Sequence, residues 1–282
     1  MSSVLFDVPG PRARARHRLW SIVGGFVVLL VLAAVIWKLW TEEAIVPEKW
    51  AFLTDGDIVW DLFVGLLSTL FAAAVAIAGA VVFGVVFAAG RLSERVWLRT
   101  PAVAVVEFFR ATPLLLLMFF LFIAYGYAIG EAFGALVISL ILYNGSVLAE
   151  IFRAGVKAVP RGQSEAAYAI GMRKSQVMLL VLVPQAVRTM LPALVSQCVV
   201  CLKDTALGYT IGYVALLRVG KSIFVDFTNN NPIAVGLVVA AVFIVICYSL
   251  SRLAVHLEER QRRQGRQPVA REGEPGAVAD AG

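Results

Sequence analysis

Charged side chains are scarce in this sequence. Only 16% of its 282 residues are charged, whereas soluble domains average about 25%. In contrast, 60% of the residues are hydrophobic and the mean hydropathy is +0.83. The apolar residues form blocks of about 20, the length that crosses the hydrocarbon core of a bilayer. The composition therefore excludes a soluble domain and predicts helices that span a membrane.

Cysteine and histidine are also rare. Cys198, Cys201 and Cys247 all fall inside apolar blocks, and the C-x-x-C spacing of the first two lacks the second half of a zinc site. His17 and His256 stand at the edges of apolar blocks, apart from any cluster of ligands or catalytic groups. We therefore expect no metal, and a membrane-embedded enzyme is the weaker alternative.

Six apolar segments are long enough to span a bilayer. They run from about Leu19 to Trp40, from Trp60 to Gly90, twice between Pro101 and Glu150 with a break near Gly130, from Thr189 to Leu217, and from Ile233 to Leu253. The first follows four arginines, as a signal peptide would. It is longer than a usual signal segment and ends in Trp-Lys-Leu-Trp rather than small residues, so we expect it to remain uncleaved.

The basic residues predict the orientation. Of the 25 Lys and Arg, 19 lie in the N-terminal arm, the 91–99 loop, the 153–188 loop or the C-terminal segment. The positive-inside rule then places both termini in the cytoplasm of a multi-pass plasma-membrane protein. It also accounts for the net charge of +6 without a nucleic-acid partner. The expected divisions are a basic cytoplasmic arm (1–18), an extra helix (19–40), an extracytoplasmic loop (41–59), a transmembrane domain (60–255) with a cytoplasmic loop (153–187), and a disordered cytoplasmic tail (256–282).

The 153–187 loop carries the most specific pattern. Ser164 is expected to cap a short helix that Gly171 ends. So short a helix is not stable alone and must dock on another surface. Pro184 is expected to end the apolar helix that follows.

Within this loop Glu165-Ala-Ala is followed after three residues by Gly171, and after nine more by Val181-Leu-Val-Pro184. This spacing resembles the EAA motif of ABC import permeases, EAA-x3-G-x9-I-x-L-P, with valine in place of the final Ile and Leu. The resemblance implies an all-α fold with six transmembrane helices, a five-helix permease core plus the N-terminal extra helix. It also implies a coupling helix that contacts a separate ATPase through Gly162, Glu165, Ala166, Ala167, Ile170 and Gly171.

Three further stretches narrow the resemblance to the polar amino-acid branch of these permeases. They are Glu107–Leu115, Tyr143–Gly155 and Lys203–Leu207, within a likeness that covers about residues 60–255. The overall likeness is greatest to the second permease of a glutamate importer. It implies that the chain forms half of a pathway for glutamate. Glutamine, aspartate or another polar amino acid is the alternative substrate.

The resemblance also implies the partners: two ATP-binding subunits, a second and similar permease, and an extracytoplasmic solute-binding protein. ATP and Mg would be bound by the partner ATPase, so the chain itself would be no enzyme and hold no cofactor. In agreement, Ala215–Ser222 lacks the first glycine of a P-loop and the strand that should precede one. An ion-coupled secondary transporter is a further alternative, but it would usually show two internal repeats, and none is convincing here.

Polar residues inside the apolar blocks are the candidates for the substrate path: Lys203, Asp204, Thr205 and Asn144. A charge at the bilayer centre costs about 2.5–3.5 kcal/mol on insertion scales, so it usually faces a partner or a cavity. Lys203 and Asp204 are therefore either a structural pair, with each other or across a dimer, or a site where Lys203 meets the substrate carboxylate. Asn144 can line the path or bond a neighbouring helix.

A second group of polar residues precedes the third span. Glu107 and Arg110 are three residues apart and share one face of a helix, and Thr112 and Pro113 follow where proline can kink the chain. The group is interpreted as an inner gate or a helix-pairing contact.

Overall fold

A computed structural model of the chain describes residues 10–41, 46–125, 131–225 and 232–265. Every regular element in those ranges is helical. In chain order they are α1 (Pro11–Thr41), the 3-10 helix η1 (Pro47–Thr54), α2 (Gly56–Leu92), α3 (Val96–Ala111), α4 (Leu114–Tyr125), α5 (Glu131–Ala158), α6 (Arg161–Ala169), α7 (Lys174–Gln176), the π-helix η2 (Val177–Leu182), α8 (Val183–Asp204), the 3-10 helix η3 (Thr205–Ile211), α9 (Leu216–Val225) and α10 (Pro232–Gly265).

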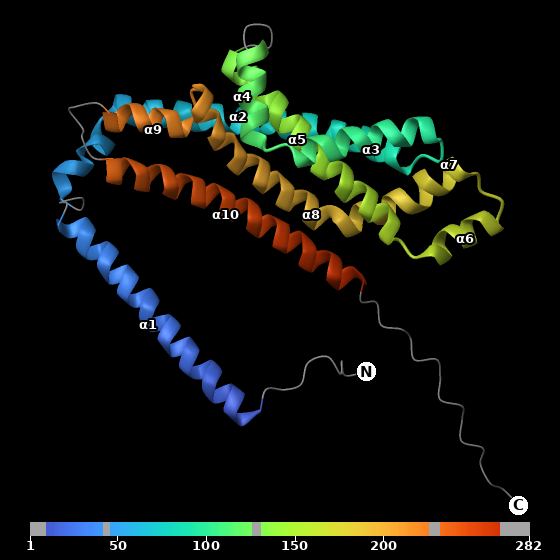
Figure 1. The fold of residues 1–282 in the computed structure, drawn as a ribbon, viewed down its shortest axis with the longest axis horizontal. Helices are drawn as coiled ribbons and strands as arrows, with labels where there is room; N and C mark the ends of the chain where they lie inside the picture. Colours follow the sequence, from blue (N-terminus) through green and yellow to red (C-terminus); the bar gives the residue numbers. More distant parts are fainter. Residues whose placement is uncertain (1–9, 42–45, 126–130, 226–231, 266–282) are drawn as a thin grey trace, which may run out of the picture.

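The helices form an elongated bundle in which α2, α5, α8 and α10 run along the long axis (Figure 1). One end, with α9 and the start of α10, is called the α9 end here, and the opposite end, with α6 and α7, the α6 end. Helix α1 diverges from the bundle, and none of its residues with described burial is buried. The predicted extra helix is thus separate from the packed body.

Small side chains bring α2 and α5 together. The buried positions of α2 recur every three or four residues along one face and are Gly65, Thr69, Ala72, Ala73, Ala76, Ala80, Gly84 and Ala88. At Gly84 a Cβ atom would lie 2.9 Å from Leu148 Cβ and 3.3 Å from the backbone nitrogen of Ala149. Membrane helices associate largely through such close van der Waals packing, because burial from water is no longer available as a driving force. The α2–α5 pair is therefore the centre of the bundle.

Five helical segments of the described chain are long and apolar enough to cross a membrane, and α3 with α4 supplies a sixth only as a bent pair. The two helices meet at an angle of 99°, and α4 projects sideways from the bundle in Figure 1. The break lies at Thr112 and Pro113. The predicted kink is thus confirmed. The third span is a broken helix rather than the straight one that its hydropathy suggests.

The fifth span differs from the prediction at both ends. Its apolar helical stretch runs from Lys174 to Ile211 instead of Thr189 to Leu217, and Leu217 belongs to the separate helix α9. Gly212, with φ of 86°, ends it in the left-handed conformation that glycine adopts without strain. The prediction that Pro184 ends a helix is wrong, because Pro184 lies in the first turn of α8, directly after the π-helical turns of η2. Pro184 has no N–H to donate, and the helix continues through it where the π-helical turns of η2 pass into α8.

The predicted disordered tail is wrong for residues 256–265, which continue α10 as helix. Glu, Gln and Arg are good helix formers, and adding residues to an existing helix avoids the unfavourable nucleation step. Residues 266–282 lie outside the described part of the chain. The predicted loop 41–59 contains η1 and the first turn of α2.

Replacing Gly84 with alanine tests the α2–α5 contact. We expect a lower melting temperature, because overpacking a tight contact costs about 1–3 kcal/mol. A Cβ atom at Gly236 on α10 would have no neighbouring atom within 4 Å, so Gly236→Ala is the matched control and should be neutral or slightly stabilising. Thermal unfolding of the detergent-purified protein measures both, and equal shifts would contradict the close packing.

Candidate functional site

The helix predicted to couple to an ATPase is present as α6, at one end of the bundle (Figure 1). It is largely uncovered: Gly162, Glu165 and Ala166 are exposed, and Ile170 just beyond it is 80% exposed. Ala167 is the exception, because it is only 5% exposed and packs inward. The Gln185 amide nitrogen also donates to Gln163 Oε1 at 3.3 Å and ties α6 to α8. One face of α6 therefore packs against its own chain, and the other face is exposed.

Gly171 ends α6 as predicted. Its φ is 82°, its N–H donates to the Tyr168 carbonyl, and the N–H of Met172 donates to the Ala167 carbonyl. These bonds form a Schellman turn, for which a left-handed residue is required. Ser164 does not cap the helix. It lies inside α6 and its hydroxyl donates to the Arg161 carbonyl, because the helix starts three residues earlier, after Pro160.

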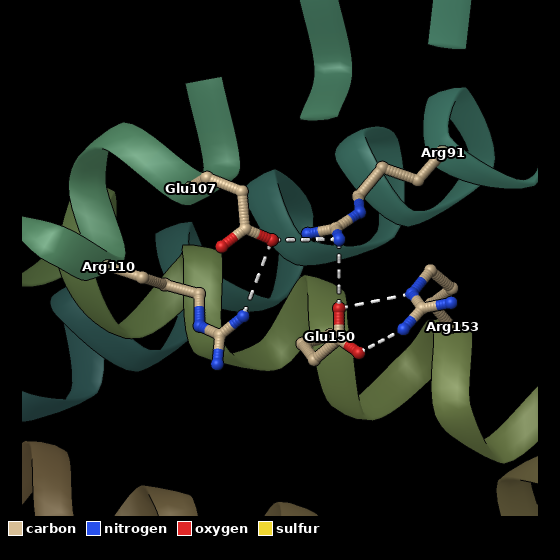
Figure 2. Close-up of polar contacts among 5 residues, drawn as sticks. All are labelled: Arg91, Glu107, Arg110, Glu150 and Arg153. Atoms are coloured by element: carbon tan, nitrogen blue, oxygen red, sulfur yellow. Dashed lines mark hydrogen bonds and ion pairs between the residues drawn. The ribbon is translucent and has the colours of Figure 1, made fainter. Parts of the chain in front are cut away.

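Near the α6 end, five charged side chains join three helices (Figure 2). Arg91 of α2 places Nη2 3.0 Å from Glu107 Oε1 of α3 and 3.1 Å from Glu150 Oε2 of α5. Glu107 also lies 3.6 Å from Arg110, and Glu150 is held by Arg153 through two hydrogen bonds. The predicted Glu107–Arg110 pair is thus the outer part of a larger network with one positive charge in excess.

Arg91 is the centre of this network. Its side chain is only 8% exposed, and its Nε and Nη1 groups are buried without an acceptor among the described residues. Replacing Arg91 with an uncharged residue would leave Glu107 and Glu150 without the ion pair that joins them. In the sequence, Arg91 was counted only as a basic loop residue. The available signal was that Arg91 directly follows a long uncharged segment, while Glu107 and Glu150 lie near the corresponding ends of later helices. That arrangement indicates an ion pair between helices.

The break between α3 and α4 begins two residues after Arg110, the last residue of the network on α3. The Thr112 hydroxyl and N–H both donate to the Phe108 carbonyl, at 2.8 and 3.0 Å. Pro113 has no N–H to continue the helix. The network therefore anchors the end of α3 immediately before the chain turns into α4.

A second polar cluster joins α5 to α8. Asn144 is fully buried, accepts from the Gln197 amide at 2.7 Å and donates to Asp204 Oδ2 at 3.4 Å. Asn144 is close to the middle of the 28 residues of α5, so the cluster lies at mid-depth in the bundle. The prediction placed Asn144 and Asp204 in one group, and the structure brings them together. Gln197 was missed, although it lies seven residues, or two helical turns, before Asp204.

Lys203 and Thr205 do not join this cluster. Lys203 is exposed and lines a shallow hollow of about 350 Å³ with Phe243, Cys247 and Tyr248 of α10. Thr205 is fully buried and its hydroxyl donates to the Leu202 carbonyl. Consecutive residues of an α-helix point about 100° apart, so Lys203 and Asp204 lie on different faces of α8, and they form no ion pair with each other in the described structure.

These features together define a helical membrane permease, with a free helix at one end and polar residues held inside the bundle. A family model described as binding-protein-dependent transport system inner membrane component matches residues 80–263. The chain belongs to this family, and it is a permease of an ABC amino-acid importer.

Several relatives are substantially similar. The chain is 44% identical over 226 residues to the glutamate transport system permease protein GluD of Corynebacterium glutamicum, covering 78% of this chain and 81% of that one. It is 31% identical to the inner membrane amino-acid ABC transporter permease YhdY of Escherichia coli, covering 86% of this chain and 71% of the other. Among solved structures, an amino acid ABC transporter crystallised with histidines aligns with a TM-score of 0.67 at 31% identity, covering 75% of this chain and 98% of that one.

Replacing Arg91 with methionine tests the charged network. We expect a loss of about 1–3 kcal/mol in unfolding free energy, because Glu107 and Glu150 lose the buried guanidinium that joins them. Arg110→Met removes a more exposed and more distant arginine from the same network and should have a much smaller effect. Thermal unfolding compares the two, and equal effects would show that burial of Arg91 is unimportant.

Proposed function

We propose that this permease imports glutamate. The proposal is supported by the 44% identity to a protein named as a glutamate permease, over about four fifths of both chains. The other candidate is a broader or different polar amino acid. It is supported by relatives named as a probable glutamine permease of Bacillus subtilis, 33% identical, and as a glutamate/glutamine/aspartate/asparagine permease of Rhodobacter capsulatus, 30% identical.

The exposed face of α6 is the proposed contact with an ATP-binding subunit. Gly162, Glu165, Ala166 and Ile170 are available for that contact, while buried Ala167 seats the helix on its own chain and Gly171 ends it. A helix of nine residues gains little stability alone, so contact with a partner protein would stabilise it. ATP and Mg would be bound by that partner.

The orientation follows from the same contact. The α6 end would face the cytoplasm, together with the basic loops and both termini, as the positive-inside rule requires. The α9 end would face outward, where a solute-binding protein would deliver the substrate. A second permease, similar to this one, would complete the pathway, of which this chain would form one half.

The substrate path is proposed to pass the mid-depth residues. Asp204, which accepts from Asn144, and Lys203 on a different face of α8 are charged groups that lipid would not tolerate. Lys203 would meet a substrate carboxylate or a carboxylate of the second permease in the hollow beside α10. Thr205 is buried within the chain and would support the turn from α8 to η3.

The charged network is the proposed link between α6 and this path. Glu150 and Arg153 lie within two to three turns of the end of α5, directly before α6. A displacement of α6 would therefore reach Arg91 and Glu107 through these ion pairs. ATP-driven closure of the partner subunits would in this way change the relative populations of two states of the permease, with Glu107, Arg110, Thr112 and Pro113 at the inner gate.

Reversing the charge of Glu165 tests the coupling contact. Glu165→Lys should leave membrane insertion intact and reduce co-purification of the ATP-binding subunit. Glu48→Lys makes the same charge change on an exposed residue of η1, far along the chain from α6, and should leave co-purification unchanged. Normal ATPase recovery and normal transport by Glu165→Lys would count against the role of α6.

Uptake of radiolabelled glutamate by cells with and without the gene tests the substrate. We expect ATP-dependent uptake to be lost without the gene and to be inhibited best by excess unlabelled glutamate. Unchanged glutamate uptake with loss of glutamine or aspartate uptake would keep the importer and overturn its substrate.

A further inference from the structure

A deep apolar groove opens on the side of the bundle at the α6 end. Its volume is about 670 Å³, within the range of roughly 300–1,000 Å³ that ligand sites typically have. The walls come from the last turns of α2, from α5, and from η2 and α8. Most of the lining is aliphatic or small and includes Val85, Ala89, Val156, Leu179 and Val187.

The polar residues of the groove are gathered at one of its ends. Ser93, Glu94 and Arg95 come from the turn between α2 and α3, and Lys174 and Ser175 from α7. Lys174 and Glu94 form an ion pair across this end. Arg95 forms no ion pair within the described structure, and its guanidinium carbon lies 6.0 Å from the ring centre of Trp97. The polar end therefore carries one net positive charge, from Arg95, together with the hydroxyl groups of Ser93 and Ser175.

The groove is placed where lipid reaches it. Val85, Leu179 and Val187 line it and are 51%, 65% and 41% exposed, so its walls continue into the apolar outer surface of the spans. Trp97 is 67% exposed beside the polar end, and exposed tryptophans are enriched at the membrane–water boundary. The polar end thus lies at headgroup level and the apolar walls at the level of the acyl chains.

We propose that this groove binds one phospholipid with an anionic headgroup, from the leaflet at the α6 end. An acyl chain occupies the apolar walls, and the headgroup accepts hydrogen bonds from Arg95, Lys174 and the adjacent serine hydroxyls. Basic pockets between membrane helices are suited to such headgroups, because anionic lipids and basic side chains attract each other at the membrane surface. The proposal rests on the chain being a membrane protein and is independent of which amino acid it transports.

Such a lipid would contact the segment that follows α6, the helix proposed to bind the ATP-binding subunit. The α2–α3 turn lines the groove together with α7 and η2, which follow α6 after Gly171. The Lys174–Glu94 ion pair joins the α2–α3 turn to α7 at the polar end. A bound lipid would fill the space behind this pair and hold the segment after α6 against α2.

Native mass spectrometry of the full-length purified protein tests the site. The probes are phosphatidylglycerol and phosphatidylcholine with identical acyl chains, so that only the headgroup differs. We expect phosphatidylglycerol to bind more tightly, and Arg95→Gln to reduce its affinity roughly fivefold while leaving phosphatidylcholine unchanged. Arg252→Gln removes a basic residue from α10, which does not line the groove, and should change neither affinity.

A second variant tests the apolar part. Ala89 is exposed and lines the groove, so Ala89→Phe fills it from a surface position and should reduce binding of both lipids. Equal binding of the two lipids by the wild type, or an equal effect of Arg95→Gln and Arg252→Gln, overturns the headgroup site. If Ala89→Phe leaves lipid binding unchanged but prevents recovery of a second permease subunit, the groove is a protein interface and the proposal is wrong.

Discussion

Glycine and alanine on facing sides of α2 and α5 let the two helices approach until a single added methyl group at Gly84 would collide with Leu148. In lipid, this close approach replaces the burial of apolar surface that stabilises a soluble core. The other contacts follow from it. α8 packs on α5, α10 packs on α8, and α9 and α3 pack on the two ends of α2. The two polar clusters are both held in place by this frame.

Two polar clusters lie at different positions along the bundle, one held by hydrogen bonds between amides and a carboxylate and the other by ion pairs. At mid-depth, the Asn144 amide donates to the carboxylate of Asp204 and accepts in turn from the amide of Gln197. Nearer the α6 end, full ion pairs around Arg91 join α2, α3 and α5 (Figure 2). Isolated charges are costly in a membrane, so a network that joins three helices also restricts how they can move relative to one another. A displacement at α6 would have to be transmitted or resisted there.

Local patterns predicted much of this arrangement. Segments of about 20 apolar residues identified the spans, and Gly171 was identified as the end of α6 because glycine commonly ends helices. The pair Glu107–Arg110 and the kink at Pro113 also follow from distances of a few residues along the chain. Patterns over longer distances were less informative. Hydropathy could not distinguish a straight third span from a helix bent by 99°, because both bury equally apolar residues.

The sequence by itself determined that this is a membrane permease, where most of the spanning helices lie and where the short helix α6 ends, because hydropathy, helix-ending glycine and the EAA spacing are local properties. Only the tertiary structure decided which side of a helix each residue faces. It separated Lys203 from its neighbour Asp204, turned Ala167 inward while Glu165 remained exposed, and made Arg91 the centre of a network whose members are up to 62 residues apart in sequence. Such choices depend on how helices pack against one another, and the close approach of α2 to α5 fixes that packing.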